Sequence, residues 1–354
     1  MAAFLSNIQT SLGLVYDSLE AIDLIYPVSI CGESVNRLAR KFVQKTEIRK
    51  RSSTVDMAKL PDKYLARDFY HPAAWGCELF KQVIPSNLFA EIGHILTVYN
   101  ISSHQNVLPS ISAQIVNKLG LSGDILPMDM SYLGCGGGLF ALQQAVNLAN
   151  KTEKGVFVYI FDQCFYIFNI CYDKKNDYFN PSMIANSIFS DGAVGFMVLP
   201  ESLHHLISQP QIEILDVCTN FISGQEIYMD ENVFVLGDGV SKVIPPKVVD
   251  LVINPLLNRN KLRLSEIEEW SIHQGGKTVL SQFGKSEILG LTEEQLKPSF
   301  ESFYEYGNFS APSCFFVLKK FFERQYLESK SNILGAIVGF GAGYYLGAGL
   351  YRWN

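Results

Sequence analysis

Short apolar runs alternate along the chain with segments whose apolar residues recur at helical spacing. The runs 92–98 and 155–161 predict buried strands, because both are short and rich in β-branched or aromatic residues. The segment 110–119 predicts a helix with its apolar residues on one face. Strands that alternate with helices in this way indicate an α/β fold.

Further elements follow the same pattern. Helices are expected over 33–43, 74–83, 241–257, 278–289 and 313–325, and a strand over 267–272. A glycine-marked turn feeds an apolar run at 190–199 and again at 339–351. Because each half of the chain ends in such a turn, we expect an internal duplication with halves at 1–200 and 201–354.

The C-terminal segment permits two interpretations. Residues 331–351 carry no charge, and Gly339, Gly343 and Gly347 keep the spacing of a membrane-helix packing motif. Six glycines between 335 and 349 make a poor helix, however, and favour two short buried strands joined by a glycine turn. We therefore expect strands here and no membrane span.

Composition narrows the class of protein. With 354 residues and 48% hydrophobic content, the chain can bury a large core. Its net charge of −6 and the absence of a long basic run argue against a nucleic-acid surface. Seven cysteines form no CxxC pair, and the N-terminus has no signal-peptide pattern, which favours a reduced, cytoplasmic location. The histidines show no metal-ligand spacing, so no metal site is expected.

The candidate chemistry centres on Cys135, which lies in Tyr-Leu-Gly-Cys-Gly-Gly-Gly (132–138) directly before an apolar helical run. The N–H groups at the start of a helix stabilise an anion, so a thiol there is expected to ionise near neutral pH. His273 and Asn308 follow far downstream, each in a turn of small residues. The three form a candidate nucleophile with two polar helpers.

Several segments, taken in order, resemble β-ketoacyl-acyl-carrier-protein synthase III and its relatives. They are 45–51, 108–121, the Gly-Cys-Gly-Gly turn at 134–137, Ser-Asp-Gly-Ala at 190–193, Tyr-Gly-Asn-Phe-Ser-Ala-Pro-Ser at 306–313, and the glycine-rich 339–343 and 347–353. His273-Gln-Gly-Gly departs from that enzyme and is similar to the His-Pro-Gly-Gly of type III polyketide synthases. Glu47 stands where the family has glycine, so we expect coenzyme A to be bound in a different way.

The resemblance implies a thiolase-like fold of five layers, α-β-α-β-α, built from the two pseudo-duplicated halves. It also implies acyl transfer in two steps, in which Cys135 accepts an acyl group from a thioester. His273 and Asn308 would then stabilise the enolate formed when a malonyl-type extender loses carbon dioxide. The Cys135 N–H, with that of Ala342 or Gly343, would form a second oxyanion site.

The same resemblance implies a pocket and a partner. Leu108 would reach into the pocket of a second copy, which gives a homodimer. Phe161 and Phe165, from an aromatic-rich stretch, are expected at the substrate pocket with Gly307, although such a stretch is as typical of a core. No cofactor is expected beyond acyl-CoA or acyl-carrier-protein thioesters as substrates.

Three functions remain open from the sequence. The first is a decarboxylative condensation in specialised polyketide or fatty-acid-derived metabolism. The second is acyl transfer to an oxygen, nitrogen or carbon nucleophile without decarboxylation. The third is a non-catalytic subunit of a ketosynthase heterodimer, against which the intact set of Cys135, His273 and Asn308 argues.

Overall fold

The computed structural model describes residues 2–104, 108–237, 239–328 and 330–354. Within these ranges, nine strands form one sheet in the order β11-β12-β13-β8-β1-β7-β6-β4-β5. The strands are β1 (Ala3–Leu12), β4 (Ile92–Tyr99), β5 (Leu126–Ser131), β6 (Gly155–Asp162), β7 (Gly192–Pro200), β8 (Gln211–Phe221), β11 (Glu269–Ile272), β12 (Leu334–Phe340) and β13 (Tyr345–Trp353). Two short pairs lie outside the sheet: β2 (Leu14–Asp17) with β3 (Lys50–Ser53), and β9 (Ile227–Asp230) with β10 (Val233–Leu236).

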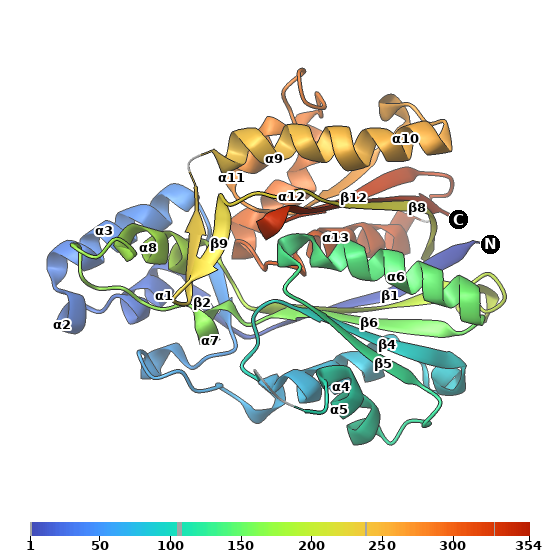
Figure 1. Ribbon diagram of the computed structural model, residues 1–354, viewed down its shortest axis with the longest axis horizontal. Coiled ribbons are helices and arrows are strands. Elements are labelled where there is room, and N and C mark those ends of the chain that lie inside the picture. The colour runs from blue at the N-terminus through green and yellow to red at the C-terminus, as the bar shows by residue number, and fades with distance from the viewer. Residues whose placement is uncertain (1, 105–107, 238, 329) are drawn as a thin grey trace.

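The helices cover and divide the sheet, as Figure 1 shows. One outer layer holds α9 (Val240–Val248), α10 (Asn254–Asn260), α11 (Lys277–Gln282) and α12 (Glu293–Tyr306), and the other holds α4 (Pro72–Val83) and α5 (Ile111–Leu119). Between the strands of the two halves lie α6 (Gly137–Thr152) and α13 (Ser313–Glu328). The expected α-β-α-β-α layering is therefore confirmed.

A lobe at one end of the layers holds the remaining helices. They are α1 (Ser18–Ile25), α2 (Val28–Cys31), α3 (Glu33–Thr46), α7 (Cys164–Ile167) and α8 (Phe179–Ile188). Its buried core includes Ile22, Val43 and Phe165. The lobe lies beside the β9–β10 hairpin, which separates it from the layered body in Figure 1.

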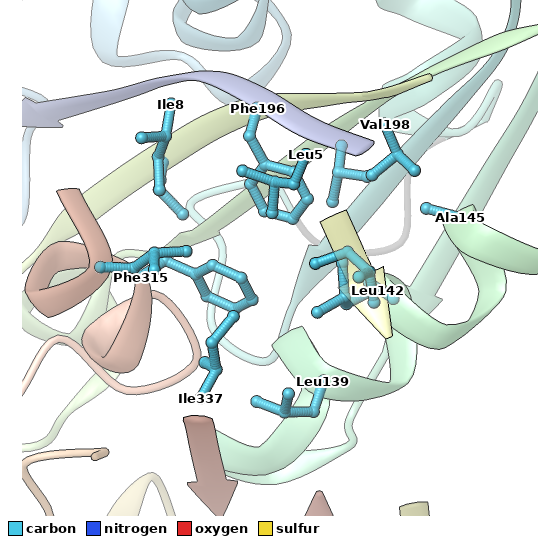
Figure 2. Close-up of a cluster of buried hydrophobic side chains, with 14 of the residues drawn as sticks. Leu5, Ile8, Leu139, Leu142, Ala145, Phe196, Val198, Phe315 and Ile337 are labelled. Carbon is cyan, nitrogen blue, oxygen red and sulfur yellow. The ribbon is translucent and has the colours of Figure 1, made fainter. Parts of the chain in front are cut away.

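The central core surrounds α6. Leu139 and Leu142 from this helix meet Leu5, Phe196 and Phe315, and all five side chains are fully buried or nearly so, as Figure 2 shows. Burying a side chain of this size is worth about 1.5–3 kcal/mol relative to exposure. The cluster therefore fixes the position of the residues at the N-terminus of α6.

The glycine spacing near the C-terminus is explained by this packing. Gly339 and Gly347 are direct partners across the antiparallel β12–β13 pair. A Cβ on Gly339 would lie 2.6 Å from Leu139 Cδ2, and a Cβ on Gly347 would lie 2.4 Å from Leu139 Cβ. The glycines thus let α6 approach the hairpin, and the membrane-helix interpretation is wrong. In the described ranges, no helix combines the length and apolarity needed to span a bilayer.

The pairing directions bear on the expected duplication. From β5 to β1 the neighbouring pairs are parallel, parallel, antiparallel and antiparallel. From β11 to β8 they are parallel, antiparallel and antiparallel, and β1 pairs with β8 where the two sets meet. The two sets thus share a pairing pattern, while the boundary between 1–200 and 201–354 stays a prediction.

Most predicted elements lie where expected, with two differences. The helix expected over 278–289 ends at Gln282, and a separate helix, α12, follows after Thr292, whose side chain caps it in a reciprocal pair with Gln295. The helix expected over 241–257 is divided into α9, a π-helical turn at Val249–Ile253 and α10. Pro245 and Pro246 lie inside α9 and remove two backbone donors just before that turn.

Candidate active site

Cys135 lies in a 3₁₀ turn, Gly134–Gly136, that leads directly into α6. The turn needs its glycine, because Gly134 has φ of 59° and a Cβ there would lie 2.6 Å from the Ala342 nitrogen. A Cβ on Gly341 would lie 2.2 Å from the Cys135 nitrogen. The nucleophile turn and the turn after β12 are therefore packed backbone to backbone.

His273 and Asn308 are held by their main chains. His273 follows β11, and its N–H donates to the Val338 carbonyl at 2.9 Å. Asn308 follows α12, and its N–H donates to the Ile188 carbonyl at 2.8 Å. Gly307 permits this approach, because its φ is 80° and a Cβ there would lie 2.3 Å from the same carbonyl oxygen.

The three predicted residues meet in one place. Cys135, His273 and Asn308 all line a narrow passage of about 30 Å³, here called the inner passage. Its other walls are apolar: Phe189, Ile227, Phe234, Leu236, Val240, Ile244, Gly275, Val279, Phe340 and Gly341. The sequence thus selected three residues that the fold brings together from three separate turns.

Asn308 presents its amide nitrogen as a free donor. Its Oδ1 accepts hydrogen bonds from the Ser310 N–H at 2.7 Å and from the Ser313 hydroxyl at 3.1 Å. Within an amide side chain only the oxygen can accept the Ser310 N–H, which fixes the orientation of the amide. Nδ2 has no hydrogen-bond partner among the described residues, and the residue lines the passage, so this amide can donate to a ligand there.

His273 is neutral. The ring is buried, and this burial lowers its pKa to about 3. Its Nδ1 has no partner among the described residues, and Phe340 packs against the ring edge to face. An unfilled nitrogen lone pair costs less than an unpaired buried N–H, so the proton belongs on Nε2.

Cys135 differs from the sequence prediction. Burial raises the pKa of its thiol to about 12, the Ser310 hydroxyl acts in the opposite direction, and the Asp162 carboxylate adds to the rise. The expectation that this thiol ionises near neutral pH is therefore wrong for the unliganded site. Loss of water and a nearby carboxylate outweigh the helix N-terminus, whose effect is at most about 2 kcal/mol.

Asp162 links three segments of the site beneath the thiol. Its side chain is fully buried at the end of β6. Oδ1 accepts from the Asn100 and Ile101 N–H groups, each at 2.7 Å, and Oδ2 accepts from Asn100 Nδ2 at 3.0 Å and the Ala311 N–H at 3.1 Å. Asn100 Nδ2 also donates to the Gly134 carbonyl at 3.1 Å. One carboxylate thus joins the end of β4, the nucleophile turn and the loop that carries Asn308.

A larger cavity opens on the other side of Cys135. This outer cavity has a volume of about 370 Å³, within the range of small-molecule sites. Phe189 and Phe234 belong to the walls of both spaces, and their rings meet edge to face at 4.9 Å. The two rings therefore form a partition beside the thiol.

The other predicted site residues are placed differently. Ala342 lines the outer cavity with Cys135, while Gly343 contacts Tyr345 and Phe221 and lines neither space. Leu108 is 93% exposed.

The three remaining residues predicted at the substrate pocket line neither the inner passage nor the outer cavity. Phe161 is buried between Tyr99 and Tyr159, and Phe165 is buried in the lobe with its ring under Arg51. Phe161 stays in the core because β6 directs it toward α4 and α5, whereas Phe165 lies on α7 and packs into the lobe. Gly307 acts through its turn and lies on neither wall.

Some site residues were missed in the sequence. Ser310 places its hydroxyl 3.5 Å from Cys135 Sγ, with its own backbone at φ of 61°. Asp162 and the partition rings were also missed. The available signals were a lone carboxylate directly after a fully apolar strand and a serine two residues after Asn308.

Comparisons with known proteins bear on the family and the fold. Residues 257–353 match the family described as 3-oxoacyl-[acyl-carrier-protein] synthase III C terminal. The C-terminal type III polyketide synthase domain of Steely1, a type I/III hybrid from Dictyostelium, superposes with a TM-score of 0.76 over 99% of both chains at 21% identity. The chain has a thiolase-like fold. Its likeness to synthase III, with type III polyketide synthase features, is confirmed.

Two similar curated proteins are both named as polyketide synthases. Type III polyketide synthase B of Arabidopsis thaliana is 26% identical over 265 residues, which cover 71% of this chain and 66% of that protein. Polyketide synthase 37 of Dictyostelium discoideum is 24% identical over 262 residues, which cover 72% of this chain but only 8% of the relative. The chain thus spans a small part of the length of that relative.

Proposed function

We propose that the protein is a type III polyketide synthase-like enzyme that condenses an acyl group on Cys135 with a malonyl- or β-ketoacyl-type thioester. One observation carries the proposal: Cys135, His273 and Asn308 line one narrow passage, and Asn308 Nδ2 has no hydrogen-bond partner within the described residues. The relatedness to polyketide synthases supports the same reaction class.

In the first step, Cys135 attacks the carbonyl carbon of an acyl thioester. A new carbon–sulfur bond forms, the old one breaks, and the thiol proton passes to the departing thiolate. Ser310, the hydrogen-bond neighbour of Sγ at 3.5 Å, is suited to relay that proton. The Cys135 and Ala342 N–H groups lie on adjoining turns and would stabilise the oxyanion.

In the second step, an extender thioester enters with its carbonyl oxygen toward His273 and Asn308. Nε2–H of the neutral imidazole and Nδ2–H of the amide both donate to that oxygen, which becomes the enolate oxygen when carbon dioxide leaves. The enolate carbon then attacks the Cys135 thioester, and the cysteine thiolate is released and reprotonated. These two neutral donors stabilise the negative charge that develops on the enolate oxygen, but they do not bind the starting carboxylate tightly.

The two spaces differ in what they can hold. The outer cavity can hold an acyl chain, whereas the inner passage has room for about one non-hydrogen atom and must widen when a thioester arm enters. The arm would belong to coenzyme A or to an acyl carrier protein. Glu47 forms an ion pair with Lys277, just after the His273 turn. This pair supports a mode of binding the carrier that differs from the one in enzymes with glycine at this position.

The proposal includes a homodimer. Leu108 is 93% exposed, and exposure of a leucine forgoes about 1.5–3 kcal/mol that burial would supply. A second copy that receives Leu108 would bury it and complete the pocket. Light scattering of the wild type and of Leu108→Asp tests this, since the charged variant should be monomeric.

The function is tested by intact-protein mass spectrometry after incubation with a panel of acyl-CoAs and acyl carrier proteins. The wild type should gain the mass of an acyl group, and Cys135→Ala should not. Adding malonyl-CoA should then yield carbon dioxide and a longer product. Loading without extension would indicate plain acyl transfer, and no loading from either carrier would indicate a non-catalytic subunit.

A further inference from the structure

The outer cavity has walls without charge. Its described lining residues contain no Asp, Glu, Lys, Arg or His: they are Asn100, Ile101, Tyr132, Gly134, Cys135, Ile167, Phe189, Tyr228, Met229, Asn232, Phe234, Ser310 and Ala342. A carboxylate or ammonium group placed inside would lose its hydration and meet no counter-ion. Burying such a charge costs several kcal/mol.

Few polar side chains line this cavity. Both bonds of Asn100 Nδ2 go to the protein, at 3.1 Å to Gly134 and 3.0 Å to Asp162. Ser310 is beside Cys135 Sγ. Tyr132, Tyr228 and Asn232 are exposed to solvent, so they mark where the cavity opens. The other described side chains of the lining are apolar and suit an alkyl chain.

The volume limits what the cavity holds. A water molecule occupies about 30 Å³ in the liquid, and a methylene group needs similar room, so 370 Å³ corresponds to roughly twelve non-hydrogen atoms. An octanoyl group has nine such atoms, and one condensation adds three. A chain of about eight carbons plus one extension therefore fills the cavity.

The β9–β10 hairpin forms the rim of this cavity. Tyr228 and Met229 on β9 are 46% and 40% exposed and line the cavity. The hairpin is fixed to the lobe, because Asn169 Nδ2 donates to the Glu231 carbonyl at 2.6 Å and the Asn169 N–H donates to the Asn232 carbonyl at 2.9 Å. These bonds hold Met229 in place at the point where a bound chain would reach solvent.

We propose that the outer cavity selects, as the group loaded on Cys135, an uncharged acyl chain of about six to eight carbons, and that Met229 sets its length. This inference rests on the proposed function, since it requires Cys135 to be acylated. It adds the chemical class of the starter and a residue that determines it.

The test compares rates of Cys135 acylation, followed by intact mass, for acetyl-, butanoyl-, hexanoyl-, octanoyl-, palmitoyl- and succinyl-CoA. Butanoyl and succinyl form a matched pair, because both have four carbons and only succinyl ends in a carboxylate. We expect hexanoyl and octanoyl to load fastest, palmitoyl at least tenfold slower, and succinyl about 100-fold slower than butanoyl.

Variants at the rim test the length limit. Met229→Trp should shorten the preferred chain by at least two carbons, so that the ratio of octanoyl to butanoyl loading falls at least tenfold, while Met229→Leu keeps the wild-type preference. Met229 is partly exposed, so both variants should fold. Succinyl loading within threefold of butanoyl, or an equal slowing of every chain by Met229→Trp, overturns this inference alone. No acylation by any thioester overturns the proposed function as well.

Discussion

The carboxylate beneath the nucleophile offers the sharpest test of how the site is held. Asp162→Asn keeps the size of the side chain and removes its charge. The aspartate accepts four hydrogen bonds, two at each oxygen. Asparagine has one oxygen, so if that oxygen keeps the Asn100 and Ile101 N–H groups, the new NH₂ faces the donors of Asn100 Nδ2 and Ala311.

The magnitude follows from this count. Two N–H groups lose this acceptor, the buried one of Ala311 and one of the two on the part-buried Asn100 Nδ2, whose other N–H keeps the Gly134 carbonyl. Each orphaned donor costs about 1–3 kcal/mol. The free energy of unfolding should therefore fall by about 2–6 kcal/mol in denaturant titration. The thiol should respond in the other direction, because the Asp162 carboxylate raises the pKa of Cys135. Its removal lowers that pKa and accelerates alkylation at a fixed pH.

The assay combines unfolding in urea with the rate of iodoacetamide alkylation at pH 8. Asp191→Asn is the matched control, because Asp191 is also fully buried but holds Thr54 and Phe165, neither of which lines the inner passage or the outer cavity. The control should lose stability without a change in thiol reactivity. If Asp162→Asn alkylates no faster than the wild type, or unfolds with unchanged free energy, the reasoning about this carboxylate is refuted.

Three further outcomes follow from the same geometry. Asn308→Ala should load an acyl group at the wild-type rate but release carbon dioxide from malonyl-CoA about 10²–10³-fold more slowly, because it removes a donor to the enolate oxygen. Radiolabelled malonyl-CoA measures the release, and an equal loss of loading would contradict this division of roles. Because burial raises the Cys135 pKa to about 12, alkylation of the wild type should rise about tenfold per pH unit from pH 7 to 9, and a plateau below pH 7 would show a stabilised thiolate. Gly341→Ala should abolish loading and destabilise the fold in thermal unfolding, since its Cβ would lie 2.2 Å from the Cys135 nitrogen, whereas Gly123→Ala, with open space, should stay within about 0.5 kcal/mol.

The predictable parts of the site are those that depend on residues next to one another in the sequence. A cysteine between glycines before an apolar helix specifies a buried turn at a helix start, and the structure has that turn at Cys135. The turns at His273 and Asn308 were equally visible, because small residues surround each. Their meeting in one passage was expected only through the resemblance, since no local pattern joins residues so far apart.

The parts that were not predictable depend on long-range pairing. The N-terminal strand β1 contains Ser6 and Asn7, and these polar residues obscure its apolar pattern. In the fold this strand is central, and Asn7 Nδ2 is satisfied by the Val83 carbonyl at 2.6 Å. Asp162 and Ser310 likewise acquire their importance from partners far away in sequence. A sequence shows that a carboxylate follows a strand but not which donors converge on it.

The neutrality of the site has a consequence for the proposed decarboxylation. The described lining of the inner passage contains no Lys or Arg, and His273 is neutral with its pKa near 3. A malonyl carboxylate that enters this passage exchanges water for Phe189 and Phe234 and gains no salt bridge. The charge then moves, as carbon dioxide leaves, from a carboxylate without partners to an enolate oxygen with two hydrogen-bond donors. A cation in the passage would stabilise the carboxylate and slow the step. His273→Lys should therefore bind malonyl-CoA more tightly than the wild type while releasing carbon dioxide more slowly, and tighter binding with undiminished release would contradict this account.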